Sequence, residues 1–158
     1  MMTRLVVGYD GSAGARAGVR WALDEAARAG GRVELMFAAE WPAYPPAAPM
    51  VPGIVVWPDA QTQRRTHDML AAARVAAAAS HPGVPVTTSL VRLPAPVALV
   101  ERSRDATLVV LGSHGHGGFS GALLGSVSLT VTAHAHCPVV VVRGAEGGSG
   151  DARPVVAG

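Results

Sequence analysis

The sequence predicts an α/β fold: a single doubly wound, Rossmann-like domain whose five-stranded parallel sheet has strand order 3-2-1-4-5 and helices on both faces. Short apolar runs alternate with helix-like segments along the chain. Hydrophobic residues make up 49% of the 158 residues and aromatic residues only 4%, which suits a buried sheet covered by Ala-rich helices. Right-handed crossover connections then make consecutive strands parallel.

The N-terminal part of the chain predicts a strand, a helix and a second strand. Residues 4–10 are a short apolar run rich in β-branched residues, typical of a buried strand. Apolar residues then recur at helical spacing, with Ser12 as the candidate N-cap and Gly30-Gly31 as the stop signal. Residues 32–41 form another apolar run and predict the second strand.

The middle of the chain predicts a loop, two helices and a third strand. Residues 42–58 contain six prolines, so we expect a loop or a stiff surface flap that could cover a site. Residues 59–81 are Ala-rich and predict a long helix. Residues 84–93 alternate and predict the third strand, and residues 94–104 predict a helix with proline in its first turn.

The C-terminal part predicts the last elements of the domain. Residues 106–112 predict the fourth strand, residues 120–136 the fourth helix and residues 137–143 the fifth strand. Residues 144–158 are of low complexity and predict a disordered tail. We therefore expect the domain to span residues 1–143.

Composition and charge exclude several classes of function. All thirteen basic residues are arginines, they are scattered, and the net charge is only +2, so neither nucleic acid nor an anionic membrane is an expected partner. The absence of lysine excludes a Schiff-base or P-loop lysine. Cys137 is the sole cysteine, which favours a reducing cytoplasm. No signal-peptide pattern begins the chain, and no apolar run reaches about 18 residues.

Fold topology predicts where a ligand binds. In a sheet of order 3-2-1-4-5, the strand order reverses between the first and fourth strands, and ligands bind at the carboxyl ends of the strands there. The segments that follow these two strands are Gly8-Tyr-Asp-Gly-Ser12 and Gly112-Ser-His-Gly-His-Gly-Gly118. The glycine-rich segment therefore lies at the expected crevice.

This glycine-rich segment is suited to phosphate. Glycines allow successive backbone N–H groups to converge on an anion, and a helix N-terminus adds further N–H groups and a favourable dipole. Gly125 and Ser126 begin the fourth helical pattern, and Ser126 and Ser128 offer hydroxyl donors. The alternative is a glycine turn that binds nothing. The spacing fits neither a P-loop nor a dinucleotide fingerprint.

The spacing resembles that of a known family. Gly112-Ser113-His114-Gly115, nine residues and Gly125-Ser126 match the G-x2-G-x9-G-S/T motif of the ATP-binding branch of the universal stress protein family. Residues 6–12 resemble the first strand of that family with its acidic residue, and residues 136–143 resemble its last strand. The proline-rich stretch and the C-terminal tail depart from the family pattern.

The resemblance implies ATP as the bound ligand, with or without Mg²⁺, and a role for each matching residue. Gly112 to Gly118 would surround ribose and phosphates, and Asp10, beside Gly8, would face the ribose or a phosphate-bound Mg²⁺. Adenine would contact the backbone of Ala39 or Ala38, since strand register leaves both open. The complete expected nucleotide site comprises Gly8, Asp10, Ala39, Gly112, Ser113, His114, Gly115, His116, Gly117, Gly118, Gly125, Ser126, Val127 and Ser128.

Other roles for these residues, mostly structural ones, stay open. Asp10 could simply cap a helix or close a turn. His114 and His116 could chelate a metal, but no third ligand is visible nearby, so no metal site is expected. The predicted fourth helix ends at a cluster of His134, His136 and Cys137. The helix dipole favours cations at a helix C-terminus, so we expect the histidines to cap the helix rather than to bind a metal.

These observations lead to three functional hypotheses. The first, which the family resemblance implies, is a cytoplasmic ATP-binding regulator of stress response or dormancy. We expect slow or no hydrolysis, because no general base can be named. The alternatives are a genuine ATP hydrolase on the same fold and a dimeric interaction module without nucleotide. The apolar last strand should be a sheet edge, and pairing of Val139, Val140, Val141 and Val142 with a second copy predicts a homodimer.

Overall fold

The computed structural model describes residues 2–39, 60–115, 124–144 and 154–157. It confirms the predicted α/β architecture. Five parallel strands have the order β3-β2-β1-β4-β5, and a sixth strand, β6, continues the sheet beyond β5. The expected proline-rich loop over residues 42–58 lies outside the described residues.

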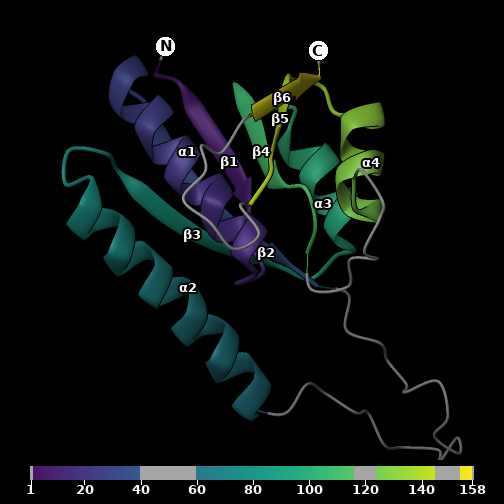
Figure 1. Cartoon of the computed structure of the whole chain (residues 1–158). Helices are drawn as coiled ribbons and strands as arrows, with labels where there is room; N and C mark the ends of the chain where they lie inside the picture. Colours follow the sequence, from purple (N-terminus) through teal and green to yellow (C-terminus); the bar gives the residue numbers. More distant parts are fainter. Residues whose placement is uncertain (1, 40–59, 116–123, 145–153, 158) are drawn as a thin grey trace, which may run out of the picture.

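The strands and helices alternate along the chain as expected (Figure 1). The elements are β1 (Arg4–Gly8), α1 (Ala13–Ala29), β2 (Arg32–Ala38), α2 (Ala60–Ser80), β3 (Val86–Val91), α3 (Ala95–Arg102), β4 (Leu108–Gly112), α4 (Ser126–His134), β5 (Val139–Val142) and β6 (Pro154–Ala157).

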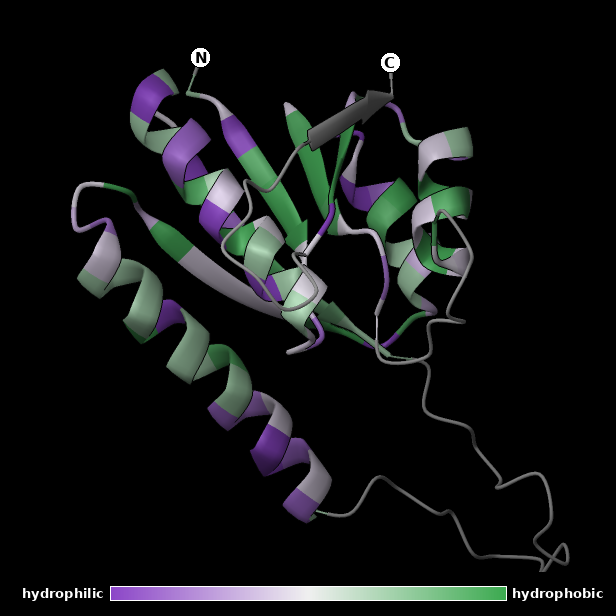
Figure 2. Cartoon of the chain, viewed as in Figure 1, coloured by the Kyte–Doolittle hydropathy of each residue, from purple (hydrophilic) through white to green (hydrophobic). Residues whose placement is uncertain are grey.

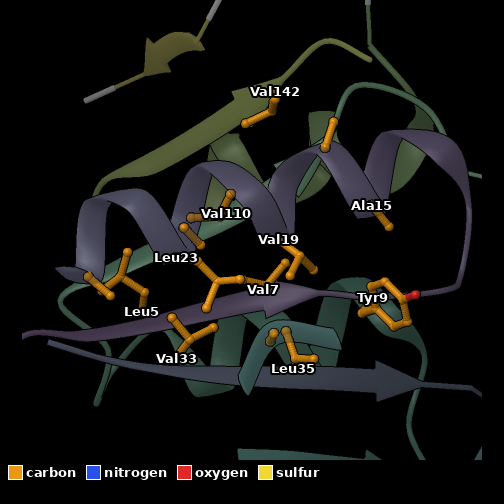
Figure 3. Close-up of a cluster of buried hydrophobic side chains, with 14 of the residues drawn as sticks. Leu5, Val7, Tyr9, Ala15, Val19, Leu23, Val33, Leu35, Val110 and Val142 are labelled. Atoms are coloured by element: carbon orange, nitrogen blue, oxygen red, sulfur yellow. The ribbon is translucent and has the colours of Figure 1, made fainter. Parts of the chain in front are cut away.

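Two hydrophobic clusters cover the two faces of the sheet. On one face, Leu5 and Val7 of β1 pack with Val19 and Leu23 of α1, as Figure 3 shows, and α2 extends this layer over β2 and β3. On the other face, Val6, next along β1, belongs to the cluster formed with α3 and α4. The alternation of side chains along β1 therefore buries both faces, and Figure 2 shows β1 and β4 as hydrophobic strands in the centre of the molecule.

Helix α1 begins and ends at the capping residues that the sequence predicts. The N–H of Ala15 donates to Oγ of Ser12 at 3.2 Å, which confirms Ser12 as the N-cap of α1. Gly30 follows the helix with φ 64°, a left-handed conformation that glycine adopts without steric cost. The fourth helix is shorter than predicted. Gly125 is extended, with φ −70° and ψ 163°, so the described helix begins at Ser126 rather than at Ser120.

The C-terminal part corrects two predictions. A disordered tail over residues 144–158 is wrong for Pro154–Ala157, which form β6 and pair antiparallel with β5. The fifth strand is therefore not the sheet edge, because β4 occupies its inner side and β6 its outer side. The boundary of the domain at residue 143 stays a prediction. No helix in the described ranges is both long and apolar enough to cross a bilayer.

Candidate functional site

A cavity of about 610 Å³ opens at the carboxyl ends of β1, β2 and β4. This is the predicted switch point, because β1 lies between β2 and β4 in the sheet. The N-terminal ends of α1 and α4 both contribute to its wall. The lining residues are Gly8, Tyr9, Asp10, Ser12, Ala15, Met36, Phe37, Ala38, Ala95, Leu99, Leu111, Gly112, His114, Gly115, Leu124, Gly125, Ser126, Val127 and Ser128.

A tight turn connects β1 to α1 beside the cavity. The N–H of Ser12 donates to Oδ1 of Asp10 at 2.9 Å, and Gly11 between them has φ 79°. Asp10 thus has the structural role in a turn that the sequence left open as the alternative to ligand binding. It also lines the cavity, so the turn holds a carboxylate in the cavity wall.

Glycines allow α1 and the segment after β4 to approach each other closely. A Cβ on Gly112 would lie 2.6 Å from the carbonyl carbon of Gly14, and a Cβ on Gly14 would lie 2.8 Å from the carbonyl oxygen of His114. Both distances are shorter than real Cβ contacts allow. Any side chain at either position would push the helix away from the strand and open the cavity wall.

The N-terminus of α4 forms the opposite wall. The N–H of Gly125 donates to the carbonyl oxygen of Ser113 at 2.7 Å, which joins the segment after β4 to the start of the helix. In the first turn of a helix, the N–H groups, here those of Ser126, Val127 and Ser128, have no intrahelical acceptor. Donors from a helix N-terminus therefore line a cavity that an anion could enter.

Two predicted ligand residues also have structural roles. Oγ of Ser128 donates to the carbonyl oxygen of Gly112 at 2.8 Å, and Ser128 is only 4% exposed. Ser113 is buried and absent from the lining, and its N–H donates to the carbonyl oxygen of Val142 at 2.9 Å. The sequence reveals their hydroxyl groups but cannot reveal these distant backbone partners.

The carboxyl end of β2 presents Ala38 to the cavity. Ala39, the other expected adenine contact, is not among the lining residues, and its N–H donates to the carbonyl oxygen of Val91 at 3.1 Å. Sequence reasoning missed most of the apolar wall, which includes Phe37 of β2 and Leu99 of α3. The sequence does place Met36 and Phe37 near the end of the second strand, and this position could have indicated that they line the site.

Charge in the described wall is sparse. Its ionisable side chains are Tyr9, Asp10 and His114, and no arginine among the described residues lines it. Arg16, which is not among the lining residues, donates from Nη1 to the carbonyl oxygen of Gly11 at 2.6 Å. An anion in the cavity would therefore depend on backbone donors, hydroxyl groups and helix dipoles rather than on a basic side chain.

Glu34 and Cys137, which have perturbed pKa values, lie elsewhere. Burial alone would raise the pKa of Glu34, but hydrogen bonds from Arg4 and Ser89 and the charge of Arg102 lower it below its ordinary value. Burial raises the pKa of the Cys137 thiol, and the Val109 N–H partly offsets this. Neither residue lines the cavity.

His116, Gly117 and Gly118 of the expected site lie outside the described residues. Within the described part of the chain, no three His, Cys, Asp or Glu side chains gather as a metal site would require. The structure thus brings Gly8, Asp10, Gly112, His114, Gly115, Gly125, Ser126, Val127 and Ser128 together around one cavity.

Comparison with known proteins identifies the family. The family model described as "Universal stress protein family" matches residues 1–143. A universal stress protein of Mycobacterium tuberculosis is 34% identical over 144 residues, which is 88% of this chain and 47% of that protein. One of Mycolicibacterium smegmatis is 38% identical over 140 residues, 88% of this chain and 45% of that protein. The chain thus spans about half the length of these curated relatives.

A solved structure supports the same relationship. A universal stress protein in complex with cAMP is 25% identical, with a TM-score of 0.67, and the match covers 91% of this chain and 98% of that one. The two proteins therefore share their architecture over nearly the full length of both chains. Together with the family model, which covers most of the sequence, these similarities show that the chain belongs to the universal stress protein family.

Proposed function

We propose that this protein binds an adenine nucleotide, with ATP as the expected ligand, in the cavity between β1, β4 and α4. The observation that carries the proposal is the N-terminus of α4, whose first-turn residues line a cavity of about 610 Å³. This volume is within the range of about 300–1,000 Å³ typical of small-molecule sites. The cAMP complex of a 25% identical relative supports an adenine nucleotide as the ligand class.

The phosphates occupy the α4 end of the cavity in this proposal. Gly125, Ser126 and Val127 supply backbone donors, the hydroxyl of Ser126 adds another, and the helix dipole favours the negative charge. Gly112 to Gly118 continue this phosphate and ribose site, as the family motif implies. The hydroxyl of Ser128 already donates to Gly112, so its contribution to phosphate binding is through the backbone.

The adenine ring occupies the apolar end near β2. Phe37 and Leu99 offer apolar contact area there, and Ala38 lies in the wall. The N–H of Ala39 is engaged by Val91, so a contact from Ala39 would come from its carbonyl oxygen. Ala38 is the better placed of the two candidates.

Asp10 is proposed to act on the ribose or on a phosphate-bound Mg²⁺. A carboxylate beside a polyphosphate is unfavourable unless a hydroxyl group donates to it or a cation lies between them. Oδ1 of Asp10 accepts from Ser12, and a Cβ on Gly115 would lie 2.7 Å from Oδ2. An oxygen ligand of this kind suits Mg²⁺, which keeps several waters and the substrate phosphates as its other ligands.

The proposed role is that of a cytoplasmic regulator in stress response or dormancy, with slow or no ATP hydrolysis. Donors that hold the bound phosphates equally in the ground state and the transition state give affinity without rate. We expect turnover well below about 1 s⁻¹. A faster rate, measured as phosphate release from ATP, would favour the hydrolase alternative.

The expected homodimer through Val139–Val142 can form only if β6 leaves β5. The outer edge of β5 pairs with β6, and the same N–H and C=O groups cannot pair with a second copy at the same time. Dimerisation through β5 therefore requires β6 to leave that edge.

Nucleotide release and titration test the proposed site. The purified protein is denatured, any released nucleotide is identified, and ATP is titrated into the wild type and Gly115→Val by calorimetry. The valine side chain would collide with Asp10 in the cavity wall, so we expect affinity to fall at least about tenfold, or 1.4 kcal/mol.

Gly83→Val is the matched control, since a Cβ there meets nothing within 4 Å and the residue lies away from the cavity. It should bind ATP like the wild type. Equal ATP binding by all three proteins would contradict the site, and binding by none of them would contradict the function.

A further inference from the structure

We propose that β6 is an intramolecular cap that occupies the outer edge of β5 and so prevents this edge from pairing with a second copy of the chain. The proposal concerns the sheet edge and does not depend on nucleotide binding. β6 runs antiparallel to β5, with Val139 opposite Ala157 and Val142 opposite Pro154. Figure 1 shows β6 beside β5 near the C-terminus.

The two outer strands of the five-stranded parallel sheet differ in how they tolerate an edge position. β3, at one edge, has the sequence VTTSLV, and all its residues are partly or fully exposed. β5, at the other, consists of four valines, each 0–3% exposed. A short apolar strand with free N–H and C=O groups is a template for pairing with another chain. β5 thus lacks polar side chains, whereas β3 carries two threonines and a serine.

The geometry of β6 matches that of a second copy. Two copies of β5 related by a two-fold axis perpendicular to the sheet would pair antiparallel, which is the direction in which β6 runs. Both partners would use the same outward N–H and C=O groups of β5, because β4 already pairs with the inner ones. Pairing with β6 and pairing with a second copy are therefore mutually exclusive.

The backbone of β6 makes it a suitable outermost strand. It begins with Pro154, which has no N–H to offer to a further strand. Prolines are among the devices that limit edge-to-edge association. The capped sheet thus ends in a strand with fewer backbone donors than β5.

Tethering decides the competition in favour of β6. Residues 143–153 connect β5 to β6 within one chain, and a tethered segment acts at an effective concentration of about millimolar. A second copy at micromolar concentration competes poorly with it. Four paired residues make a weak strand when the tether is lost, so severing the connection should reverse the outcome.

Cleavage of the connection after folding tests this proposal. A site-specific protease sequence replaces part of residues 145–153 in the full chain, and sedimentation velocity is recorded before and after cutting, from micromolar to about 0.2 mM protein. We expect a monomer before cutting and a dimer afterwards, with a dimer dissociation constant at least about tenfold lower. Uncut and cut samples contain the same residues, so each is the control for the other.

A second pair of variants tests the strand without cutting. The double substitution Val155→Pro and Val156→Pro removes the N–H groups of two adjacent residues, one of which faces β5. The double substitution Val155→Thr and Val156→Thr keeps both N–H groups and the β-branched character. We expect the proline variant to dimerise like the cut protein and the threonine variant to stay monomeric.

Amide hydrogen exchange locates the interface. In the uncut protein the outward amides of Val139–Val142 should be protected by pairing with β6. They should lose protection in the cut protein at low concentration and regain it on dimerisation. An uncut chain that dimerises as tightly as the cut one contradicts the cap. So does a cut chain that remains monomeric throughout the range, or one that forms species larger than a dimer, because a closed two-fold pair leaves no free β5 edge.

Discussion

Asp10 shows how one residue can combine a structural and a proposed binding role. One carboxylate oxygen accepts the Ser12 N–H in the turn before α1, while the residue lines the cavity. Asparagine keeps an oxygen for the Ser12 N–H but removes the charge that a cation requires. Substitutions at this one position therefore separate the turn from the proposed ligand contact.

We expect Asp10→Asn to keep the stability of the protein and lose the gain in ATP affinity that Mg²⁺ provides. Asp10→Ala should lose that gain and also about 0.5–1.5 kcal/mol of stability, since the turn hydrogen bond disappears. Calorimetric ATP titrations with and without Mg²⁺, combined with urea unfolding, measure both effects. A Mg²⁺ dependence unchanged in Asp10→Asn would restrict Asp10 to its turn role.

Glu34 is a buried carboxylate that three polar neighbours stabilise on the α3 side of the sheet. Nη2 of Arg4 lies 2.6 Å and Oγ of Ser89 lies 2.7 Å from its oxygens, and Arg102 lies 3.5 Å away. These partners lower its pKa against the opposing effect of burial. A group whose pKa is lower in the folded than in the unfolded state stabilises the fold above its unfolded pKa. That contribution is lost as the pH falls through the folded pKa.

Glu34→Gln should therefore lower the free energy of unfolding by about 1–3 kcal/mol at pH 7. The difference from the wild type should be constant above the ordinary glutamate pKa of 4.5 and shrink as the pH falls below it. Urea unfolding across this pH range measures it. Glu25→Gln, which removes the exposed pair with Arg28, is the control and should change stability by less than about 0.5 kcal/mol. A pH-independent loss in Glu34→Gln would show that packing, not charge, is responsible.

At the scale of elements, α1 is defined at both ends by local backbone chemistry. Ser12 caps its first turn, and Gly30 ends it with a left-handed conformation in open space. Since nothing lies within 4 Å of a Cβ on Gly30, any cost of a side chain there comes from the backbone conformation alone. This makes Gly30 a clean probe of helix termination.

Gly30→Ala should destabilise the protein by about 1 kcal/mol, because alanine pays for the left-handed conformation. Gly83→Ala is the matched control: its Cβ also meets nothing within 4 Å, but its φ is not in the left-handed region. The control should be neutral or slightly stabilising. Thermal or urea unfolding compares the two variants. Equal effects would mean that the φ of Gly30 does not set the cost.

At the scale of the whole molecule, the candidate site joins elements that are far apart in the sequence. Asp10 follows β1, His114 follows β4 and Ser126 begins α4, and all three line one cavity. A ligand that binds there contacts several elements at once. Because these elements come together only in the folded state, the unfolded chain has no such site. Nucleotide binding should therefore stabilise the whole domain.

We expect ATP at about 100 times its dissociation constant to add about 2.7 kcal/mol of stability, which corresponds to a rise in Tm of about 5–10 °C. Differential scanning calorimetry measures the shift, and Gly115→Val at the same ATP concentration should show a much smaller one. A nucleotide that raises the Tm of both proteins equally would bind somewhere other than this cavity.

The sequence alone determined the order of elements as far as β5, the parallel sheet, the caps of α1 and the place of Gly112–Gly115 at the switch point. These features follow from hydrophobic periodicity, local capping and the handedness of crossovers, all of which are readable within short windows. Tertiary structure decided that Ser128 bonds Gly112, that Ala38 rather than Ala39 lines the cavity, and that β6 covers β5. Each of these depends on which distant backbone groups meet at hydrogen-bonding distance, and no local pattern in a sequence specifies that.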